Sequence, residues 1–172
     1  MPFTPLHVGP GLLVKSVLNT SFSLMIFGWA QILMDIQPLV VLITGEGHLL
    51  GFSHTFIGAS LIALGSAVTG KYGIEWAVHA PLLGFSDDNR AMFDWNRKLR
   101  WGIVLFSAFV GTFSHVYLDA IMHSDVQPFF PVDVSNPILG VISVSALQKL
   151  CMYTGVVGMC LYVIVRFFRR VD

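Results

Sequence analysis

Charged residues are scarce in this chain. Asp, Glu, Lys and Arg make up only 12% of its 172 residues, whereas a soluble domain typically carries about 25%. The ten basic and ten acidic residues balance to a net charge of zero, which argues against a nucleic-acid partner. The sequence also contains no P-loop, no dinucleotide-binding fingerprint, no nucleophile elbow and no internal repeat. It therefore gives no indication of the enzyme classes that these motifs mark.

Two further absences concern covalent processing. The two cysteines, Cys151 and Cys160, lie nine residues apart in one apolar stretch. Nine helical steps place them on opposite faces and about 13 Å apart along the helix axis, which is too far for a disulfide. A cleavable signal peptide is not expected either, because Met1–Pro10 has no basic n-region and contains three prolines.

Long apolar runs, in contrast, are abundant. Hydrophobic residues make up 55% of the chain, and four stretches reach the roughly 20 helical residues that cross a bilayer core. These stretches are Ser21–Thr44, Gly51–Gly70, Trp101–Met122 and Leu147–Phe168. The sequence therefore predicts an all-α fold, a polytopic membrane helical bundle with four full transmembrane helices, as one integral membrane domain over residues 1–172.

A short additional helix is expected before the first long stretch. Thr4-Pro5 is typical of an N-cap followed by a first-turn proline, and the helix should run to about Leu18. Its length of roughly 22 Å is marginal for a crossing, so we expect it to span a thin place or to re-enter. Within the first long stretch, Asp35 and Pro38 predict a kink.

Glycines recur every seven residues in the second long stretch, at Gly51, Gly58 and Gly65. Small residues on one stripe let helix backbones approach closely in lipid. We therefore expect this face, with His54 on it, to point into the bundle.

Basic residues predict the orientation in the membrane. Residues 71–100 form the most polar segment, which we expect to be a cytoplasmic loop with an amphipathic helix. Its basic cluster at Arg90–Arg100 and a second one at Arg166–Arg170 fall on one side if the spans alternate. Cytoplasmic loops are enriched in Lys and Arg. The sequence thus predicts a multi-pass protein of the cell (inner) membrane with a cytoplasmic C-terminus.

Ionisable residues recur inside the apolar stretches, where each costs roughly 2.5–3.5 kcal/mol on insertion scales. His115, Asp119 and His123 stand four residues apart, so they share one helical stripe. The i, i+4 spacing lets an imidazole and a carboxylate reach one ion. Asp35 and His54 lie in other stretches, near the same membrane face.

Neutral imidazoles and ionised carboxylates are suitable ligands for a divalent cation. We therefore expect a metal site near the non-cytoplasmic face, with ligands from His7, Asp35, His54, His115 and Asp119. His48 and His123 are further candidate ligands, and the candidate catalytic carboxylates are Asp35, Asp119 and Asp125. The alternative is a hydrogen-bonded His–Asp pair that only joins helices.

Most of these residues lie in short motifs. The motifs are Met1–His7 with Gly9-Pro10-Gly11, Asp35-x-x-Pro38, Gly51–Thr55, and His115-x-x-x-Asp119 through Asp125-x-x-Pro128-Phe129. With them the chain resembles the membrane-bound metal-dependent hydrolases of bacteria and archaea, over most of its length. The resemblance implies that the same five residues form the site. A distant likeness to zinc-dependent phospholipases C and related nucleases implies zinc and phosphoester hydrolysis. Gln37 departs from the second acid that this family often has there, which argues against two metal ions.

Three kinds of function are open at this point. In an enzyme, a divalent ion would activate water against a small-molecule or lipid-like substrate that enters from the bilayer. In a transporter, the same His and Asp residues would relay protons or metal, although five spans are few and no inverted repeat is visible. In a structural protein, they would fix helix packing. A site open to one side favours the enzyme, and a polar path to both sides favours transport.

Overall fold

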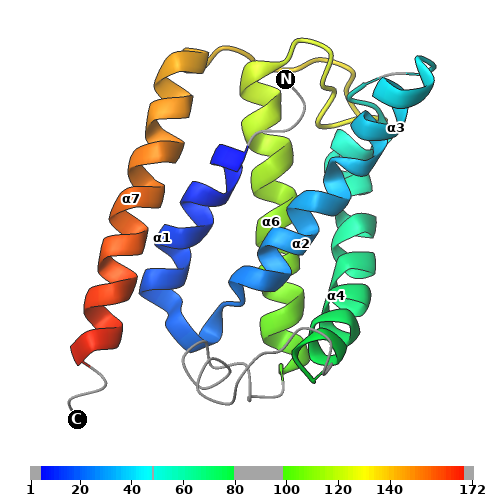
Figure 1. Cartoon of the computed structure of the whole chain (residues 1–172). Coiled ribbons are helices and arrows are strands. Elements are labelled where there is room, and N and C mark those ends of the chain that lie inside the picture. Colours follow the sequence, from blue (N-terminus) through cyan, green and yellow to red (C-terminus); the bar gives the residue numbers. More distant parts are fainter. Residues whose placement is uncertain (1–4, 48, 80–98, 169–172) are drawn as a thin grey trace.

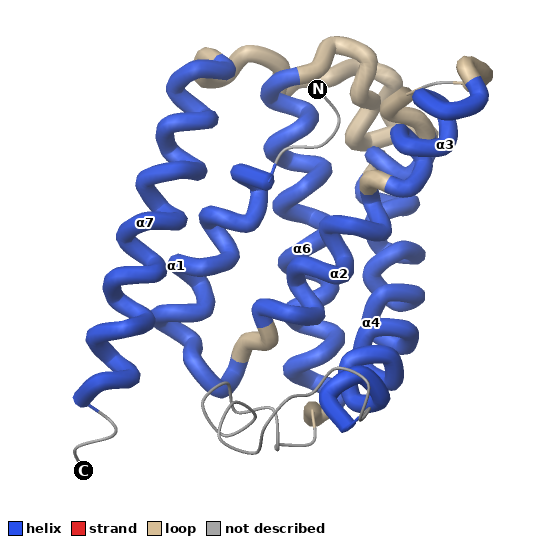
Figure 2. The backbone as a smooth tube through the Cα atoms, viewed as in Figure 1, coloured by secondary structure: helices blue, strands red, loops and turns tan. Residues whose placement is uncertain are grey.

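The computed structural model describes residues 5–47, 49–79 and 99–168, and within them all regular structure is helical (Figure 1 and Figure 2). In chain order the elements are the 3-10 helix η1 (Pro5–His7), α1 (Val8–Leu18), η2 (Asn19–Ser21), α2 (Leu24–Met34), α3 (Ile36–Thr44), η3 (Phe52–His54), α4 (Phe56–His79), α6 (Trp101–Met122) and α7 (Val144–Phe168). The predicted all-α class is confirmed for these residues.

Four helical stretches among the described residues are long and apolar enough to cross a membrane. They are Leu24–Thr44, which combines α2 and α3, Phe56–Ala77, Trp101–Met122 and Val144–Phe168. Each overlaps one of the four stretches predicted from the sequence. The molecule is therefore a helical bundle with the composition of a membrane protein.

One helix extends beyond its predicted end. The second predicted stretch ends at Gly70, whereas α4 continues to His79. Lys71 stabilises this extension by pairing with Glu75 one turn later and by donating to the carbonyl of Leu99 at 2.8 Å. The first nine residues of the predicted polar segment are thus helical, and residues 80–98 lie outside the described part.

The N-terminal helix α1 is short. Its 11 residues span about 16 Å, less than a bilayer crossing needs, and Figure 1 shows it beginning part of the way along the bundle. Its amino end therefore lies beside α6 and α7 rather than beyond their ends. That this helix crosses or re-enters the membrane stays a prediction.

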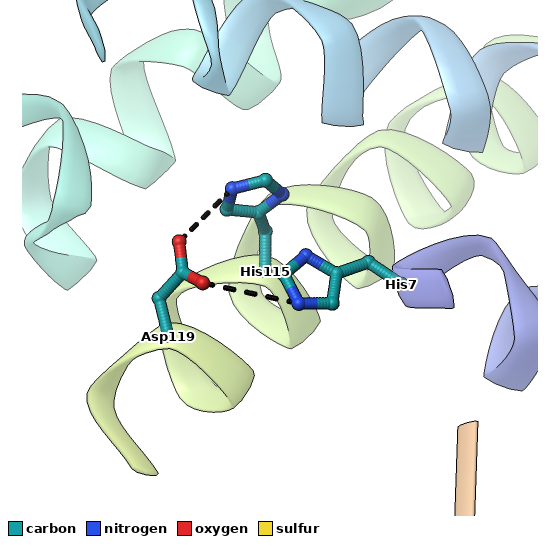
Figure 3. A group of neighbouring side chains, drawn as sticks. All are labelled: His7, His115 and Asp119. Atoms are coloured by element: carbon teal, nitrogen blue, oxygen red, sulfur yellow. Dashed lines mark ion pairs between the residues drawn. The ribbon is translucent and has the colours of Figure 1, made fainter. Parts of the chain in front are cut away.

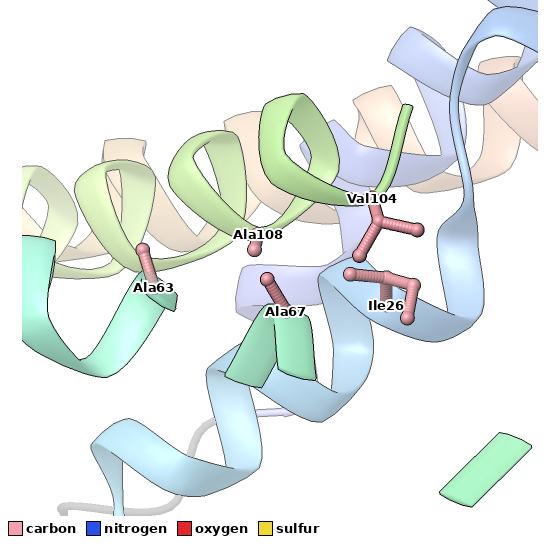
Figure 4. Packing of buried hydrophobic residues seen from close by; sticks show 5 residues of the cluster. All are labelled: Ile26, Ala63, Ala67, Val104 and Ala108. Carbon is pink, nitrogen blue, oxygen red and sulfur yellow. The ribbon is translucent and has the colours of Figure 1, made fainter. Parts of the chain in front are cut away.

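Three helices, α2, α4 and α6, pack on one another through small side chains. Figure 4 shows Ala63 and Ala67 of α4 against Val104 and Ala108 of α6, with Ile26 of α2 beside them. All five are buried to within 1% of full coverage. Small residues allow this close approach where lipid supplies no hydrophobic driving force.

The predicted glycine stripe is not the packing face of α4. Gly51 precedes the helix, Gly65 is exposed with open space around it, and Gly58 lies against the backbone of the η3 turn. Because Gly58 has no side chain, the η3 turn can pack against it. Farther along the helix, at Gly65, the same face is exposed. Alanines one turn apart, at 59, 63 and 67, make the close contact instead.

The short helix α1 and the long helix α7 form a second packing unit, a pair held by glycines. A Cβ atom added at Gly9 would fall well under 3.0 Å from the carbonyl oxygen of Cys151. One added at Gly158 would do the same to the backbone of Leu13. The two backbones thus touch, and η1 at the start of α1 brings this pair against α6.

The segment between α6 and α7 closes one end of the bundle. Asn136 Nδ2 donates to the carbonyls of Ala120 and His123 at 2.8 and 3.2 Å, and the Gly140 amide donates to that of Ile121. These bonds satisfy carbonyls that the end of a helix leaves without partners. Leu50, Ala120 and Val126 form a buried apolar cluster at this end of the bundle.

Candidate metal centre

His115 and Asp119 lie on the buried face of α6, one helical turn apart. The i, i+4 spacing places both on the same side of the helix, with His115 Nε2 3.2 Å from Asp119 Oδ2. Their side chains are only 1% and 6% exposed. Both therefore face other helices rather than lipid.

Asp35 reaches this pair from the break between α2 and α3. Pro38 has no N–H to donate to the carbonyl four residues earlier, so the helical ladder is interrupted there, and the predicted kink is present. Asp35 Oδ1 lies 3.4 Å from His115 Nε2. At 10% exposure its side chain is the most accessible of the residues gathered here.

His54 comes from the 3-10 turn η3 that precedes α4, and its side chain is fully buried. Gln37 holds this turn, because its Oε1 accepts from the Ser53 amide at 3.1 Å. Ser53 Oγ in turn lies 2.9 Å from His54 Nδ1. His54 Nε2 is thereby directed toward Asp119 Oδ2, 3.3 Å away. Gln37 thus helps to position a neighbouring candidate ligand.

His7 completes the group from the end of η1. Figure 3 shows the Asp119 carboxylate with one oxygen toward His115 and the other toward His7, whose Nε2 is 3.8 Å away. The His7 and His115 rings meet edge to face, with centroids 5.0 Å apart. Two packing units therefore meet here: the α1–α7 pair supplies His7, and α2, α4 and α6 carry or border the other residues.

All five predicted ligands are brought together from four separate parts of the chain. Only His115 and Asp119 lie within a regular α-helix; Asp35 lies at a helix break, and His7 and His54 end 3-10 turns. Irregular backbone is tolerated at membrane depth where protein buries it. The turns and the helix break direct His7, His54 and Asp35 toward the site at angles that positions within a straight helix would not provide.

The contacts have the spacing of metal ligands rather than of hydrogen bonds. Two groups of three, His7–His115–Asp119 and Asp35–His54–His115, have their donor atoms within 4.8 Å of one another. The paired atoms are 3.2–3.8 Å apart, whereas N–H···O bonds are about 2.7–3.2 Å. Tetrahedral bonds of about 2.0–2.2 Å put neighbouring ligands about 3.3–3.6 Å apart.

Several of these atoms are buried without a hydrogen-bond partner in the described part of the chain. They are both ring nitrogens of His7, Asp35 Oδ1, His54 Nε2 and His115 Nε2. Leaving a polar group unpaired and buried costs roughly 1–3 kcal/mol. A cation between these atoms would satisfy several of them at once, so the donor set fits a divalent ion.

The arrangement fits one ion better than two. His115 belongs to both three-residue groups, and its Nδ1 is engaged by Gln31 Oε1 at 2.5 Å. Its single remaining nitrogen can bind one ion at a time. Gln37, an amide where a second metal ion would need a further carboxylate, is consistent with a single ion.

The remaining candidates that the structure describes belong to neither group of three. Asp125 is exposed and belongs to neither group, so the structure does not bring this proposed catalytic acid to the site. His123 is a half-buried residue at the end of α6 and also lies outside both groups. His48 lies outside the described residues.

Sequence reasoning missed Gln31 and Ser53, which hold the outward nitrogens of two histidines. A buried amide in the middle of an apolar stretch is the signal that could have indicated Gln31, because it needs partners in lipid.

No family model, curated protein or solved structure matches the chain.

Proposed function

We propose that this chain is a membrane-embedded hydrolase that holds one divalent cation, zinc, through His7, Asp35, His54, His115 and Asp119. The observation that carries the metal is the set of buried, unpartnered nitrogen and oxygen atoms that face one another at ligand spacing. Catalytic zinc sites take three imidazole or carboxylate ligands and keep the fourth position for water, so three of these five residues would bind the ion at one time, as in either group of three. Hydrolysis is proposed from the resemblance of the motifs to membrane-bound metal-dependent hydrolases.

A bound zinc ion would lower the pKa of a coordinated water and polarise a phosphoryl or acyl oxygen. The chain's own carboxylates would then orient the substrate and move the proton. Asp35 is the residue best suited to this, because its side chain is the most accessible of the five. It borders Ile36 and Leu39 of α3, which are exposed apolar residues. A lipid-like phosphoester would therefore meet an apolar surface beside the carboxylate.

Transport across the bundle is less well supported. On one side of the site, α2, α4 and α6 close on the apolar cluster of Ile26, Ala63, Ala67, Val104 and Ala108 (Figure 4). These side chains offer no hydrogen-bonding group to an ion or proton. A hydrolase needs its substrate to reach the site from one side only, and an apolar closure on the other side is compatible with this.

In the proposed orientation, the protein lies in the inner membrane of the cell and its C-terminus is in the cytoplasm. The carboxyl ends of α4 and α7 and the amino end of α6 share one end of the bundle (Figure 1). Lys71, Arg100 and Arg166 lie near these ends, and Lys and Arg mark cytoplasmic loops. Reporters fused after residue 172 and inserted in residues 126–133 should therefore report opposite sides; the same side for both would contradict this orientation.

The proposed reaction predicts zinc-dependent turnover. Purified full-length protein in detergent should hydrolyse at least one member of a panel of phospholipids, phosphodiesters and carboxylic esters. A chelator should abolish the activity and added zinc should restore it, because the ion supplies the activated water. The Asp35→Asn variant should lose at least about 100-fold in turnover, the usual range for a general base.

Asp125→Asn is the matched control for that experiment, since it removes an exposed carboxylate at the same end of the bundle. Its turnover should equal that of wild type. Activity that survives complete chelation would exclude the metal-dependent mechanism.

A further inference from the structure

Gln31 occupies a position where an apolar residue would be expected. It lies on α2, inside a membrane-spanning stretch, and is 5% exposed. It precedes Asp35 by one helical turn and faces α6. A buried amide has two donors and an acceptor to satisfy, so its contacts are informative.

The hydrogen bonds of Gln31 determine which way its amide points. Its Nε2 donates to the carbonyl of Gly111 at 3.1 Å and approaches Ser114 Oγ at 3.4 Å. A carbonyl oxygen can only accept, so the NH₂ group must be on that side. Gln31 Oε1 therefore faces His115, 2.5 Å from Nδ1.

This orientation selects one tautomer of His115. Because Gln31 Oε1 can only accept, the hydrogen must be on His115 Nδ1. In the neutral ring the lone pair is then on Nε2, the atom that faces Asp35 and Asp119 at 3.4 and 3.2 Å. Second partners of this kind orient metal-binding histidines in general.

The corresponding contact at His54 does not select a tautomer. Ser53 Oγ lies 2.9 Å from His54 Nδ1, but a hydroxyl can either donate or accept. Of these two contacts, only that of Gln31 fixes a proton on the ring.

We propose that Gln31 is a positioning residue of the candidate metal centre, which holds His115 as the Nδ1–H tautomer with Nε2 directed at the ion. This rests on the proposed metal site and extends it to a residue that does not touch the ion. A chemically matched replacement should preserve the role, whereas an apolar residue of similar size should not.

Cobalt(II) alone is the probe, because its visible absorption reports the ligands directly. In full-length protein, Gln31→Leu should lower the Co²⁺ affinity by about 10–100-fold and alter the spectrum. Gln31→Glu keeps an acceptor opposite Nδ1, and its affinity should stay within about threefold of wild type or increase. Ser114→Ala is the control: it removes the long 3.4 Å contact with Gln31 and the hydroxyl's own bond to the Gly111 carbonyl. It keeps the bonds of Gln31 to Gly111 and His115, so affinity should stay unchanged.

Equal affinity for wild type and Gln31→Leu would overturn the positioning role while leaving the metal site intact. An equal fall in the Leu and Glu variants would also overturn it, because both lose the NH₂ group that bonds Gly111 while only Glu keeps the acceptor for His115. If wild type itself binds no Co²⁺, the proposed function fails and the role of Gln31 with it. Should Gln31→Leu not fold, nitrogen NMR of zinc-loaded wild type gives the answer: a proton on Nδ1 of His115 is expected, and one on Nε2 contradicts the proposal.

Discussion

Replacing His115 with alanine should abolish zinc binding and any zinc-dependent hydrolysis. His115 is the one residue shared by both groups of candidate ligands, and its Nε2 lies within 3.4 Å of Asp35 and Asp119. Its loss breaks both groups at once. Because changing a residue that merely supports a ligand already costs about 10–100-fold in affinity, loss of this ligand should cost at least about 100-fold. Metal titration and turnover measure the effect.

His123→Ala is the matched control on the same helix. This histidine ends α6 two turns after His115 and belongs to neither ligand group, so its variant should bind zinc as wild type does. The His115→Ala protein should still fold, because the cost of leaving Gln31 Oε1 without its donor is offset in part by the removal of the unpaired Nε2. A His115→Ala protein that binds zinc normally would reduce the cluster to a contact between helices.

Gly158→Ala should strongly destabilise the protein. A methyl group at this position would fall well under 3.0 Å from the backbone of Leu12 and Leu13 in α1, which cannot move aside as a flexible side chain would. Forcing atoms into such a packed contact typically costs about 1–3 kcal/mol, and more when backbones must separate. We expect a lower melting temperature in detergent and, because α1 begins next to His7, weaker zinc binding.

Gly65→Ala provides the comparison within the same protein. Nothing lies within 4 Å of a Cβ atom at Gly65, which is on the exposed face of α4. Alanine also favours a helix by up to about 1 kcal/mol over glycine, so this variant should be as stable as wild type or slightly more so. Equal melting temperatures for the two variants would show that α1 and α7 do not pack as described.

The sequence was sufficient for features that depend on local pattern. Apolar length alone predicts the four candidate spans, and proline chemistry predicts the break beside Asp35. The i, i+4 spacing of His115 and Asp119 predicts a shared face for any helix that contains them. These inferences need no knowledge of which helices are neighbours.

Features that depend on tertiary contacts could not be predicted in this way. The η3 turn exists because Gln37, on another element, accepts a hydrogen bond from Ser53, so His54 appeared to belong to a regular helix. Gly58 seemed to mark a helix–helix contact, yet it accommodates that turn. Gln31 carries no charge, so among its apolar neighbours the sequence gives little indication of its role. Its role depends on α6 lying opposite.

The most direct measurement of the central claim is X-ray absorption at the zinc edge of the purified, zinc-loaded protein. One ion bound by these residues predicts a first shell of nitrogen and oxygen atoms at about 2.0–2.2 Å, with the outer-shell scattering of imidazole rings. The imidazole signal should decrease in His115→Ala. A first shell of oxygen atoms without imidazole, or sulfur at about 2.3 Å, would contradict a metal centre formed by His7, Asp35, His54, His115 and Asp119.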